Sequence, residues 1–387
     1  MATPATPIET KVAKAEQIEV KGNPNVAKGD PIGVKGIDHI EFYVDDAEAW
    51  AKKHEFVLGM RRRFRGDPST GLKGRNSIVT GQGRINFVFT EPADGAGGGG
   101  LEHDLVAEHV AKHGNGVKNV CFNVKDPGKA VEHVRSCGID IVAEPSNTNG
   151  FHYAAIQAYG DTIHGFAKRD NPGEFAPGFV PVEGGEENDA VVLAMVDHVV
   201  ANVEDMNEWV DYYARVFGFD ERRHFDINTG KSALMSKVVG NEEGYIKLPI
   251  NEPSSQNSQI QEFLDEYKGP GVQHIALLTP DIVTAVSKSR ERGFAFLEVP
   301  AEYYGEAKVR VGEIKENWDD LQQHGVLIDR DRPDGYLLQL FTQTLFDRPT
   351  LFYEIIQRQG NSDGFGEGNF KALFEAIERD QARRGVL

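Results

Sequence analysis

The 387-residue chain has few cysteines and no long hydrophobic run. Its two cysteines, Cys121 and Cys137, supply neither a disulfide framework nor a cysteine-rich zinc site. The longest unbroken apolar run, residues 190–196, is far shorter than the roughly 20 residues that a membrane-spanning helix needs. The first thirty residues also contain no apolar stretch of the kind found in secretory signal peptides.

Positive charge is also scarce. The chain has 42 Lys and Arg against 60 Asp and Glu, which gives a formal net charge of −18. Nucleic-acid-binding proteins need a basic surface to replace counterions, and anionic membranes attract basic segments. We therefore expect no nucleic-acid partner and no membrane partner. The sequence favours a cytoplasmic enzyme or binding protein, and we expect a homo-oligomer, a dimer or a tetramer.

The chain contains an internal repeat. Residues 36–44 reappear as residues 195–203, 159 positions later, and residues 116–122 reappear as residues 271–277, 155 positions later. Further matches follow in the same order with small insertions between them, which indicates two homologous halves. After Pro300 the second half carries about twenty extra residues.

Each half divides again into two modules. In the third quarter, residues 196–203 predict a strand, residues 206–216 an amphipathic helix, and residues 232–239 and 245–250 two further strands. The sequence therefore predicts an α+β fold of two homologous domains. Each domain is expected to be a pair of βαβββ modules that form a cupped, barrel-like mixed sheet.

Segments of different composition mark the domain boundaries. Residues 1–30 predict a disordered N-terminal tail, and residues 172–190, rich in Pro, Gly and Glu, predict a linker. The N-terminal domain then covers residues 31–171 and the C-terminal domain residues 191–387. Residues 366–384 predict an amphipathic helix that ends the chain as a lid.

The repeat selects candidates among the twelve histidines. His198 and His274 occupy equivalent places, early in the first strand of their modules. The corresponding residues of the first half are His39 and Asn119. A pair of histidines therefore survives only in the second half.

A third candidate ligand lies near the C-terminus. Residues 351–358 predict a strand that places Glu354 on an apolar face, where an ionised carboxylate is costly unless a cation satisfies it. Counting back 175 positions gives Phe179, so the first half is expected to lack this group. Two imidazoles and one carboxylate form the facial triad of non-haem Fe(II) oxygenases, with three positions open. The sequence thus predicts one Fe(II) per chain, bound in the C-terminal domain only.

These residues also have a structural interpretation. A histidine in a strand is commonly a satisfied core residue, and a glutamate in an apolar strand commonly pairs with arginine. His109 and His113 lie four apart on a predicted helix, with His103 upstream, and this spacing is compatible with a metal site. We favour a polar surface helix for them.

A series of motifs in the second half occurs in order over about 190 residues. They are MNEW (206–209), SALMSKV (232–238), PINEP (249–253), SQI (258–260), GVQHIAL (271–277), DGYLLQLF (334–341), RPTLFYEII (348–356) and GFGEGNFKALFEAI (364–377). On these motifs the second half closely resembles the 4-hydroxyphenylpyruvate dioxygenase family of the vicinal-oxygen-chelate superfamily. The first half resembles it only in outline. Small departures, such as QRQG at 357–360 where ERHG is common, touch no ligand position.

The resemblance implies roles for individual residues. It places iron on the three ligands that the repeat selects. It also implies that the substrate's phenol end is lined by Ser232, Asn251 and Gln259. Gln273 and Gln339 would lie near the metal and the keto-acid head, and Phe341, Phe365 and Phe370 would form the aromatic wall and the inner face of the lid.

The resemblance also implies an activity, the Fe(II)-dependent conversion of 4-hydroxyphenylpyruvate and O₂ to homogentisate and CO₂ in tyrosine catabolism. The substrate's own keto acid would replace the 2-oxoglutarate that chemically related oxygenases need. One alternative is 4-hydroxymandelate synthase, which hydroxylates the benzylic carbon of the same substrate. It is disfavoured because that enzyme carries a smaller aliphatic residue where Phe341 stands. Another alternative is a non-catalytic small-molecule-binding protein on the same fold.

Overall fold

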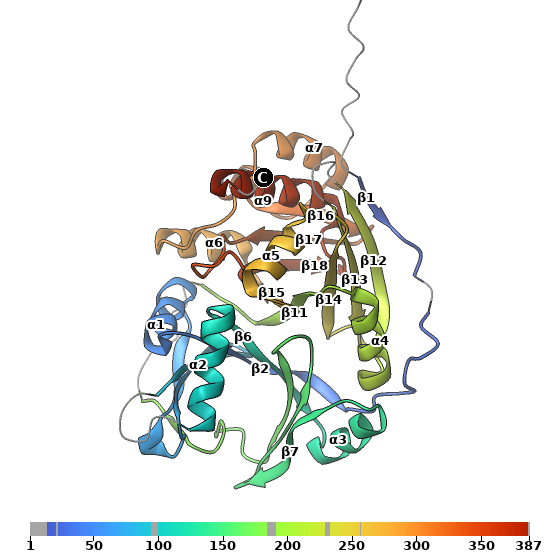
Figure 1. Ribbon diagram of the computed structural model, residues 1–387. Helices are drawn as coiled ribbons and strands as arrows, with labels where there is room; N and C mark the ends of the chain where they lie inside the picture. Colours follow the sequence, from blue (N-terminus) through green and yellow to red (C-terminus); the bar gives the residue numbers. More distant parts are fainter. Residues whose placement is uncertain are drawn as a thin grey trace, which may run out of the picture.

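The computed structural model describes residues 14–20, 22–93, 100–183, 191–228, 233–255 and 257–385. They form two halves, one above the other in Figure 1, with the first half in blue to green and the second in yellow-green to red. Within the described residues, each half contains one mixed sheet of nine strands. The predicted α+β fold of two homologous domains is confirmed.

The first half follows the predicted order of two βαβββ modules. The first module consists of β2 (Val34–Tyr43), α1 (Ala47–Leu58), β3 (Arg61–Gly66), β4 (Arg75–Gln82) and β5 (Ile85–Pro92). Helix α2 (Leu101–His113) leads to the second module. That module consists of β6 (Gly116–Val124), α3 (Pro127–Ser136), β7 (Ile141–Thr148), β8 (Phe151–Gln157) and β9 (Ile163–Arg169).

The second half repeats this order and adds two helices. Its first module consists of β11 (Met195–Asn202), α4 (Met206–Phe217), β12 (Asp220–Asn228), β13 (Ala233–Gly240) and β14 (Lys247–Pro253). Helix α5 (Gln259–Tyr267) connects it to β15 (Gly271–Leu278), α6 (Ile282–Glu291), β16 (Leu327–Arg332), β17 (Gly335–Phe341) and β18 (Phe352–Gly360). The extra residues after Pro300 form α7 (Glu302–Val311) and α8 (Trp318–His324).

The strand order brings the first and last strands of each module to the centre of the sheet. In the second half, β11 pairs in parallel with β14, and β15 pairs in parallel with β18. The first strands of the two modules, β11 and β15, pair antiparallel. Strands β11, β15 and β18 therefore lie side by side, and residues two apart on each of them share a face.

Helix α4 shows how the local sequence sets the ends of an element. The Asp205 carboxylate accepts hydrogen bonds from the backbone N–H groups of Asn207 and Glu208, 3.0 and 3.4 Å away. Gly218 ends the helix in the left-handed conformation, with a φ of 68°. The helix predicted over residues 206–216 is therefore confirmed to within one residue.

Two segments outside the modules differ from the sequence prediction. Lys14–Gln17, within the tail that we expected to be disordered, forms strand β1 and pairs antiparallel with β12. Phe179–Pro181, within the predicted linker, forms strand β10 and pairs antiparallel with β3. Both segments lie at sheet edges, where unpaired backbone N–H and C=O groups accept another strand. Residues 1–13 and 184–190 lie outside the described part of the chain.

The chain ends in a helix where we expected the lid. A short 3₁₀ turn, Glu367–Asn369, precedes α9 (Phe370–Arg384). Figure 1 shows α9 in red, packed against the second half and far from the first. Among the described helices, none combines the length and the apolar character needed to cross a membrane.

Candidate iron centre and substrate pocket

Three neighbouring strands bring the predicted metal ligands together. Ala276 of β15 pairs with His198 of β11 on one side and with Glu354 of β18 on the other. His274 lies two residues before Ala276 on β15, so its side chain emerges on the same face. The register of the sheet therefore gathers two imidazoles and one carboxylate from segments about 80 residues apart in the sequence.

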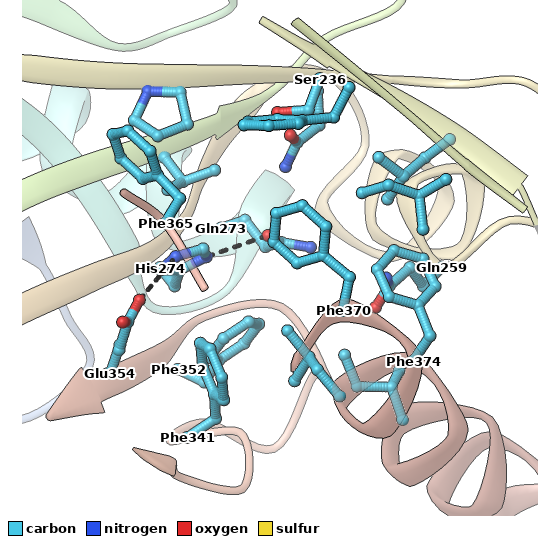
Figure 2. Close-up of a pocket in the computed structure, with 18 of the residues that line it drawn as sticks. Ser236, Gln259, Gln273, His274, Phe341, Phe352, Glu354, Phe365, Phe370 and Phe374 are labelled. Atoms are coloured by element: carbon cyan, nitrogen blue, oxygen red, sulfur yellow. Dashed lines mark hydrogen bonds and ion pairs between the residues drawn. The ribbon is translucent and has the colours of Figure 1, made fainter. Parts of the chain in front are cut away.

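The donor atoms of these three residues lie within 4.8 Å of one another. His198 Nε2 is 3.1 Å, and His274 Nε2 is 3.6 Å, from the same oxygen of Glu354, Oε2. Figure 2 shows His274 and Glu354 turned toward each other. The imidazole rings of the two histidines are 5.7 Å apart and nearly perpendicular. Two imidazole nitrogens and a carboxylate oxygen that converge in this way suit a first-row transition metal.

The electrostatics of the three groups agree with a cation between them. Burial alone would raise the pKa of Glu354, but the two histidines outweigh it and lower that pKa. Burial lowers the pKa of His274 despite the nearby carboxylate. Burial also opposes protonation of His198, yet Glu354 and Asp197 outweigh it and raise its pKa. Glu354 is thus ionised although it is buried, and its ion-pair partners in the described chain are these two imidazoles.

Neighbouring residues hold the two imidazoles in orientation. Asp197 Oδ2 lies 2.8 Å from His198 Nδ1, which leaves Nε2 for the centre. Arg358 binds both oxygens of Asp197, at 2.8 and 2.7 Å, and donates to the Gly364 carbonyl at 2.7 Å. Gln273 Oε1 lies 3.1 Å from His274 Nδ1. Such partners fix the tautomer and direction of a ligating histidine.

A cavity opens next to the three ligands. The space between its walls, open mouth included, is about 610 Å³. Figure 2 shows Glu354 and His274 at one side and Gln259 at the other, with Phe370 and Phe374 between them. Aromatic rings also pack on the ligands themselves, since Phe352 stacks on His274 at 4.9 Å and Phe365 lies 5.3 Å from His198. The other side chains of the wall are largely apolar.

Most of the residues predicted for substrate contact line this cavity. They are Asn251, Gln259, Gln273, Phe341, Phe365 and Phe370. Asn251 is held by a hydrogen bond of 3.1 Å from its Nδ2 to Asn202 Oδ1. Ser232 lies outside the described residues.

Gln339 is placed differently from the other predicted residues. It is fully buried, and it is not among the side chains that line the cavity. Neither amide atom has a hydrogen-bond partner among the described residues. Gly366 covers it so closely that a Cβ at position 366 would lie 2.2 Å from Gln339 Nε2. A buried amide without partners is a group that a bound ligand or water can satisfy.

The sequence analysis missed several residues of the site. Ser236 and Phe352 line the cavity, and Asp197 and Arg358 support the first ligand. Strand alternation over the predicted strand 232–239 places Ser236 on the same face as Ser232, so Ser236 could have been predicted from the sequence. The pair of Asp197 and Arg358 has no local signal, because the two residues are 161 positions apart.

The first half lacks counterparts of two of the three ligands. One of them, the counterpart of Glu354, is a different residue from the one that we predicted. Phe179 is not the counterpart of Glu354, since it lies in the edge strand β10. In β9, which corresponds to β18, the position that matches Glu354 is Gly165. Asn119, the counterpart of His274, accepts a hydrogen bond of 2.9 Å from the Gly165 backbone. A Cβ on Gly165 would lie 2.8 Å from Cys121 Sγ, so this position has no room for a carboxylate.

Comparisons with known proteins identify the family of the chain. The family model "Glyoxalase/Bleomycin resistance protein/Dioxygenase superfamily" matches residues 36–166 and 195–340. A 4-hydroxyphenylpyruvate dioxygenase of Neurospora crassa is 39% identical, over 96% of this chain and 98% of the relative. Enzymes of the same name from Dictyostelium discoideum and Caenorhabditis elegans are each 40% identical, over 92% and 93% of this chain and 100% and 95% of their own lengths.

A solved structure has the same fold throughout. It is a triple mutant of 4-hydroxymandelate synthase from Streptomyces coelicolor, with a TM-score of 0.79 and 29% identity. The similarity covers 91% of this chain and 100% of that one. On the identity and coverage of its relatives, the chain belongs to the 4-hydroxyphenylpyruvate dioxygenase family.

Proposed function

We propose that this protein is an Fe(II)-dependent dioxygenase that converts 4-hydroxyphenylpyruvate and O₂ to homogentisate and CO₂. The observation that carries the proposal is the position of His198, His274 and Glu354 at one side of an aromatic cavity with amide groups on its other walls. The relatives reported above are named for this activity, and they match almost the whole chain.

One Fe(II) per chain would be held by His198 Nε2, His274 Nε2 and one oxygen of Glu354. When bound, iron supplies the open coordination positions and electrons for a reaction between O₂ and a 2-oxo acid. Two neutral imidazoles and one carboxylate leave a dication with a net charge near +1. The anionic head of a 2-oxo acid is therefore attracted to the ligand side of the cavity.

The remaining residues bind and orient the substrate. The phenyl ring would lie among Phe341, Phe370 and Phe374, whose faces and edges form most of the aromatic wall. Ser236, Asn251 and Gln259, which line the same cavity, would offer hydrogen bonds to the phenol group. With both ends of the substrate held, the carboxylate, the keto group and the ring keep one orientation while the side chain is cleaved and migrates.

The lid contributes by excluding water. Helix α9 supplies Phe370, Leu373, Phe374 and Ile377 to the cavity wall. A dry site strengthens electrostatic contacts and protects reactive species from side reactions with water.

A test of the proposal uses purified protein with Fe(II), ascorbate and 4-hydroxyphenylpyruvate. We expect homogentisate as the aromatic product, with oxygen uptake that does not require added 2-oxoglutarate. 4-Hydroxymandelate as the product would instead support the synthase, which the solved relative's fold makes the natural second candidate. Substrate binding without oxygen uptake would support a non-catalytic binding protein.

The metal assignment has its own control within the chain. We expect His274→Ala to lose iron and activity, because it removes one of three ligands. His39→Ala changes the counterpart of His198 in the first half and should retain one Fe(II) per chain. Full iron occupancy in His274→Ala would contradict the proposed site.

We also propose that the protein is a cytoplasmic homo-oligomer, a dimer or a tetramer. Its two cysteines, both free, suit a reducing compartment. Light scattering after size exclusion measures the oligomeric state, and a mass of a single 42.7 kDa chain would contradict this part of the proposal.

A further inference from the structure

Helix α2 carries two histidines that are not where the sequence analysis placed them. We favoured a polar surface helix for His109 and His113, yet their exposed fractions are 3% and 1%. The helix packs against α5 of the second half, and the His113 ring stacks on Tyr267 of α5 at 4.4 Å. Because four residues make about one helical turn, the two imidazoles lie on one face, with ring centroids 4.8 Å apart.

His109 is a buried polar side chain without a hydrogen-bond partner. Neither of its ring nitrogens has one among the described residues. Its ring lies edge-on to Tyr43 at 5.4 Å. Burial lowers the pKa of His109 to about 3, so the imidazole is neutral and a nitrogen lone pair is free to bind a metal. A buried histidine with both nitrogens unused is rare in folded proteins, because an unsatisfied polar group is costly.

A carboxylate completes the cluster. Asp161 Oδ2 lies 2.7 Å from His113 Nε2, and Asp161 has an exposed fraction of 37%. His113 Nδ1 lies close to the Tyr267 carbonyl oxygen, so its Nε2 is directed toward Asp161. Donor atoms of His109, His113 and Asp161 lie within 4.8 Å of one another, as do those of the three candidate iron ligands.

We propose that His109, His113 and Asp161 form a second metal site, which binds a transition-metal dication such as Zn²⁺. Two imidazoles and one carboxylate suit zinc, which binds three protein ligands and a water at about 2.0–2.1 Å in tetrahedral geometry. The exposed edge of Asp161 leaves room for that water. The carbonyl of Tyr267 orients His113 as the supporting partners of the iron centre orient theirs.

Two lysines near the cluster do not prevent binding. Lys112 Nζ lies 3.3 Å from Asp161 Oδ1 and 3.4 Å from its Oδ2, but the Lys112 side chain is half exposed and can move into solvent. Lys118 donates to the backbone carbonyl of Asp161 and not to its carboxylate. The carboxylate is therefore available to a metal on the side that faces His113.

The site would fasten the contact between the two halves. Gly160, beside Asp161, packs so tightly on the second half that a Cβ there would lie 2.5 Å from the Pro270 carbonyl oxygen. The end of α2 contacts the second half through Tyr267. A dication would join α2 to the loop at Asp161. It would therefore hold in place the two parts of the first half that contact residues 267–270 of the second half.

Zinc binding to the full-length, metal-free protein tests the proposal. We expect two Zn²⁺ per chain by equilibrium dialysis and elemental analysis, because the iron ligands also accept zinc. His274→Ala should lose one of them. Asp161→Asn, in an exposed loop that tolerates an isosteric change, should lose the other, with an affinity at that site lower by tenfold or more. His109→Gln should behave in the same way as Asp161→Asn.

The control is His103→Gln, which lies on the same helix outside the cluster and should still bind two Zn²⁺. In the His274→Ala background, Zn²⁺ should raise the melting temperature, and adding Asp161→Asn should abolish that rise. One Zn²⁺ per chain in the unsubstituted protein, or two in both Asp161→Asn and His109→Gln, would overturn the proposal. Because His274→Ala and Asp161→Asn affect different ions, failure of this site is distinguishable from failure of the iron centre.

Discussion

Two residues distinguish the half that carries the proposed iron centre from its counterpart. Both halves keep an aspartate next to the first histidine, Asp197 and Asp38, and an arginine bound to that aspartate, Arg358 and Arg169. What differs is the second imidazole and the carboxylate, which asparagine and glycine replace in the first half. The aspartate and arginine that orient the first histidine are thus present in the first half as well, although that half lacks a complete set of ligands.

The support should nevertheless matter where the ligands are present. We expect Asp197→Asn to weaken Fe(II) binding by about 10- to 100-fold. The Asp197 carboxylate orients His198 and raises its basicity, and a neutral amide at this position would do neither. The matched control is Asp38→Asn, which makes the same change beside His39. Dissociation constants from Fe(II) titration test this, and equal iron affinity in both variants would show that Asp197 has no such role.

At this scale the sequence predicted the three residues that converge in the structure better than the side chains around them. The repeat identifies His198 and His274, and the apolar strand identifies Glu354 as an unusual charge. The counterpart of Glu354 was assigned wrongly because insertions around α7, α8 and the β17–β18 connection change the offset from 155 at β15 to 189 at β18. Only the strand register reveals Gly165.

At the scale of elements, hydrophobic periodicity and helix caps predicted the strands and helices of the modules. Open sheet edges and packing between the halves determined the elements that the sequence did not predict. Strand β1 pairs with β12, whose backbone N–H and C=O groups would otherwise be unpaired at the sheet edge. The composition of the tail does not reveal this pairing. Helix α2 was expected on the surface because its sequence is polar, with a weakly apolar face. Its histidines are buried because α5, from the other half, packs on them.

Helix α9 is the element whose function is most open to test. We expect Phe370→Ala to reduce the homogentisate formed per O₂ consumed, by twofold or more, while iron occupancy remains complete. The reason is that Phe370 forms part of the cavity wall but does not reach the ligands, so its loss admits water without removing iron.

Arg383→Ala provides the control on the same helix, because Arg383 points to solvent and pairs with Glu298 at 3.1 Å. Its ratio of product to oxygen should equal that of the unsubstituted protein. Deletion of residues 366–387 should uncouple the reaction further, with all three ligands still present. An unchanged ratio in Phe370→Ala and in the deletion would mean that α9 only stabilises the fold.

At the scale of the whole molecule, the two halves are joined by a pair of buried hydrogen bonds that follow the repeat. His54 Nε2 of α1 lies 2.8 Å from the Tyr353 hydroxyl of β18. His164 Nε2 of β9 lies 2.7 Å from the Tyr213 hydroxyl of α4. Tyr213 is the counterpart of His54, and Tyr353 is the counterpart of His164, so the same contact occurs twice with histidine and tyrosine exchanged.

Burial keeps both histidines neutral in these contacts. His54 Nδ1 lies 2.8 Å from the Trp50 carbonyl, and His164 Nδ1 lies 3.2 Å from the Val120 carbonyl. These nitrogens carry the proton, so each Nε2 accepts from a tyrosine hydroxyl. Burial lowers the pKa of His54 and of His164 to about 4. Protonation would place a positive charge in this buried contact and would require each tyrosine hydroxyl to accept instead of donate.

The stability of the protein should therefore fall as the pH falls from 6.5 toward 4. Folded His54 and His164 bind protons less readily than in the unfolded chain, whose histidine pKa is about 6.5, so acid favours unfolding. Between pH 7 and pH 5 each should contribute a loss of about 2 kcal/mol in the free energy of unfolding. We expect His54→Gln and His164→Gln each to shrink the difference between the two pH values by about that amount. All other titratable groups are present in every variant, so their contributions cancel in the comparison. Urea unfolding at both pH values measures the difference. If it is the same in both variants as in the unsubstituted chain, the contacts between the halves do not depend on neutral histidines.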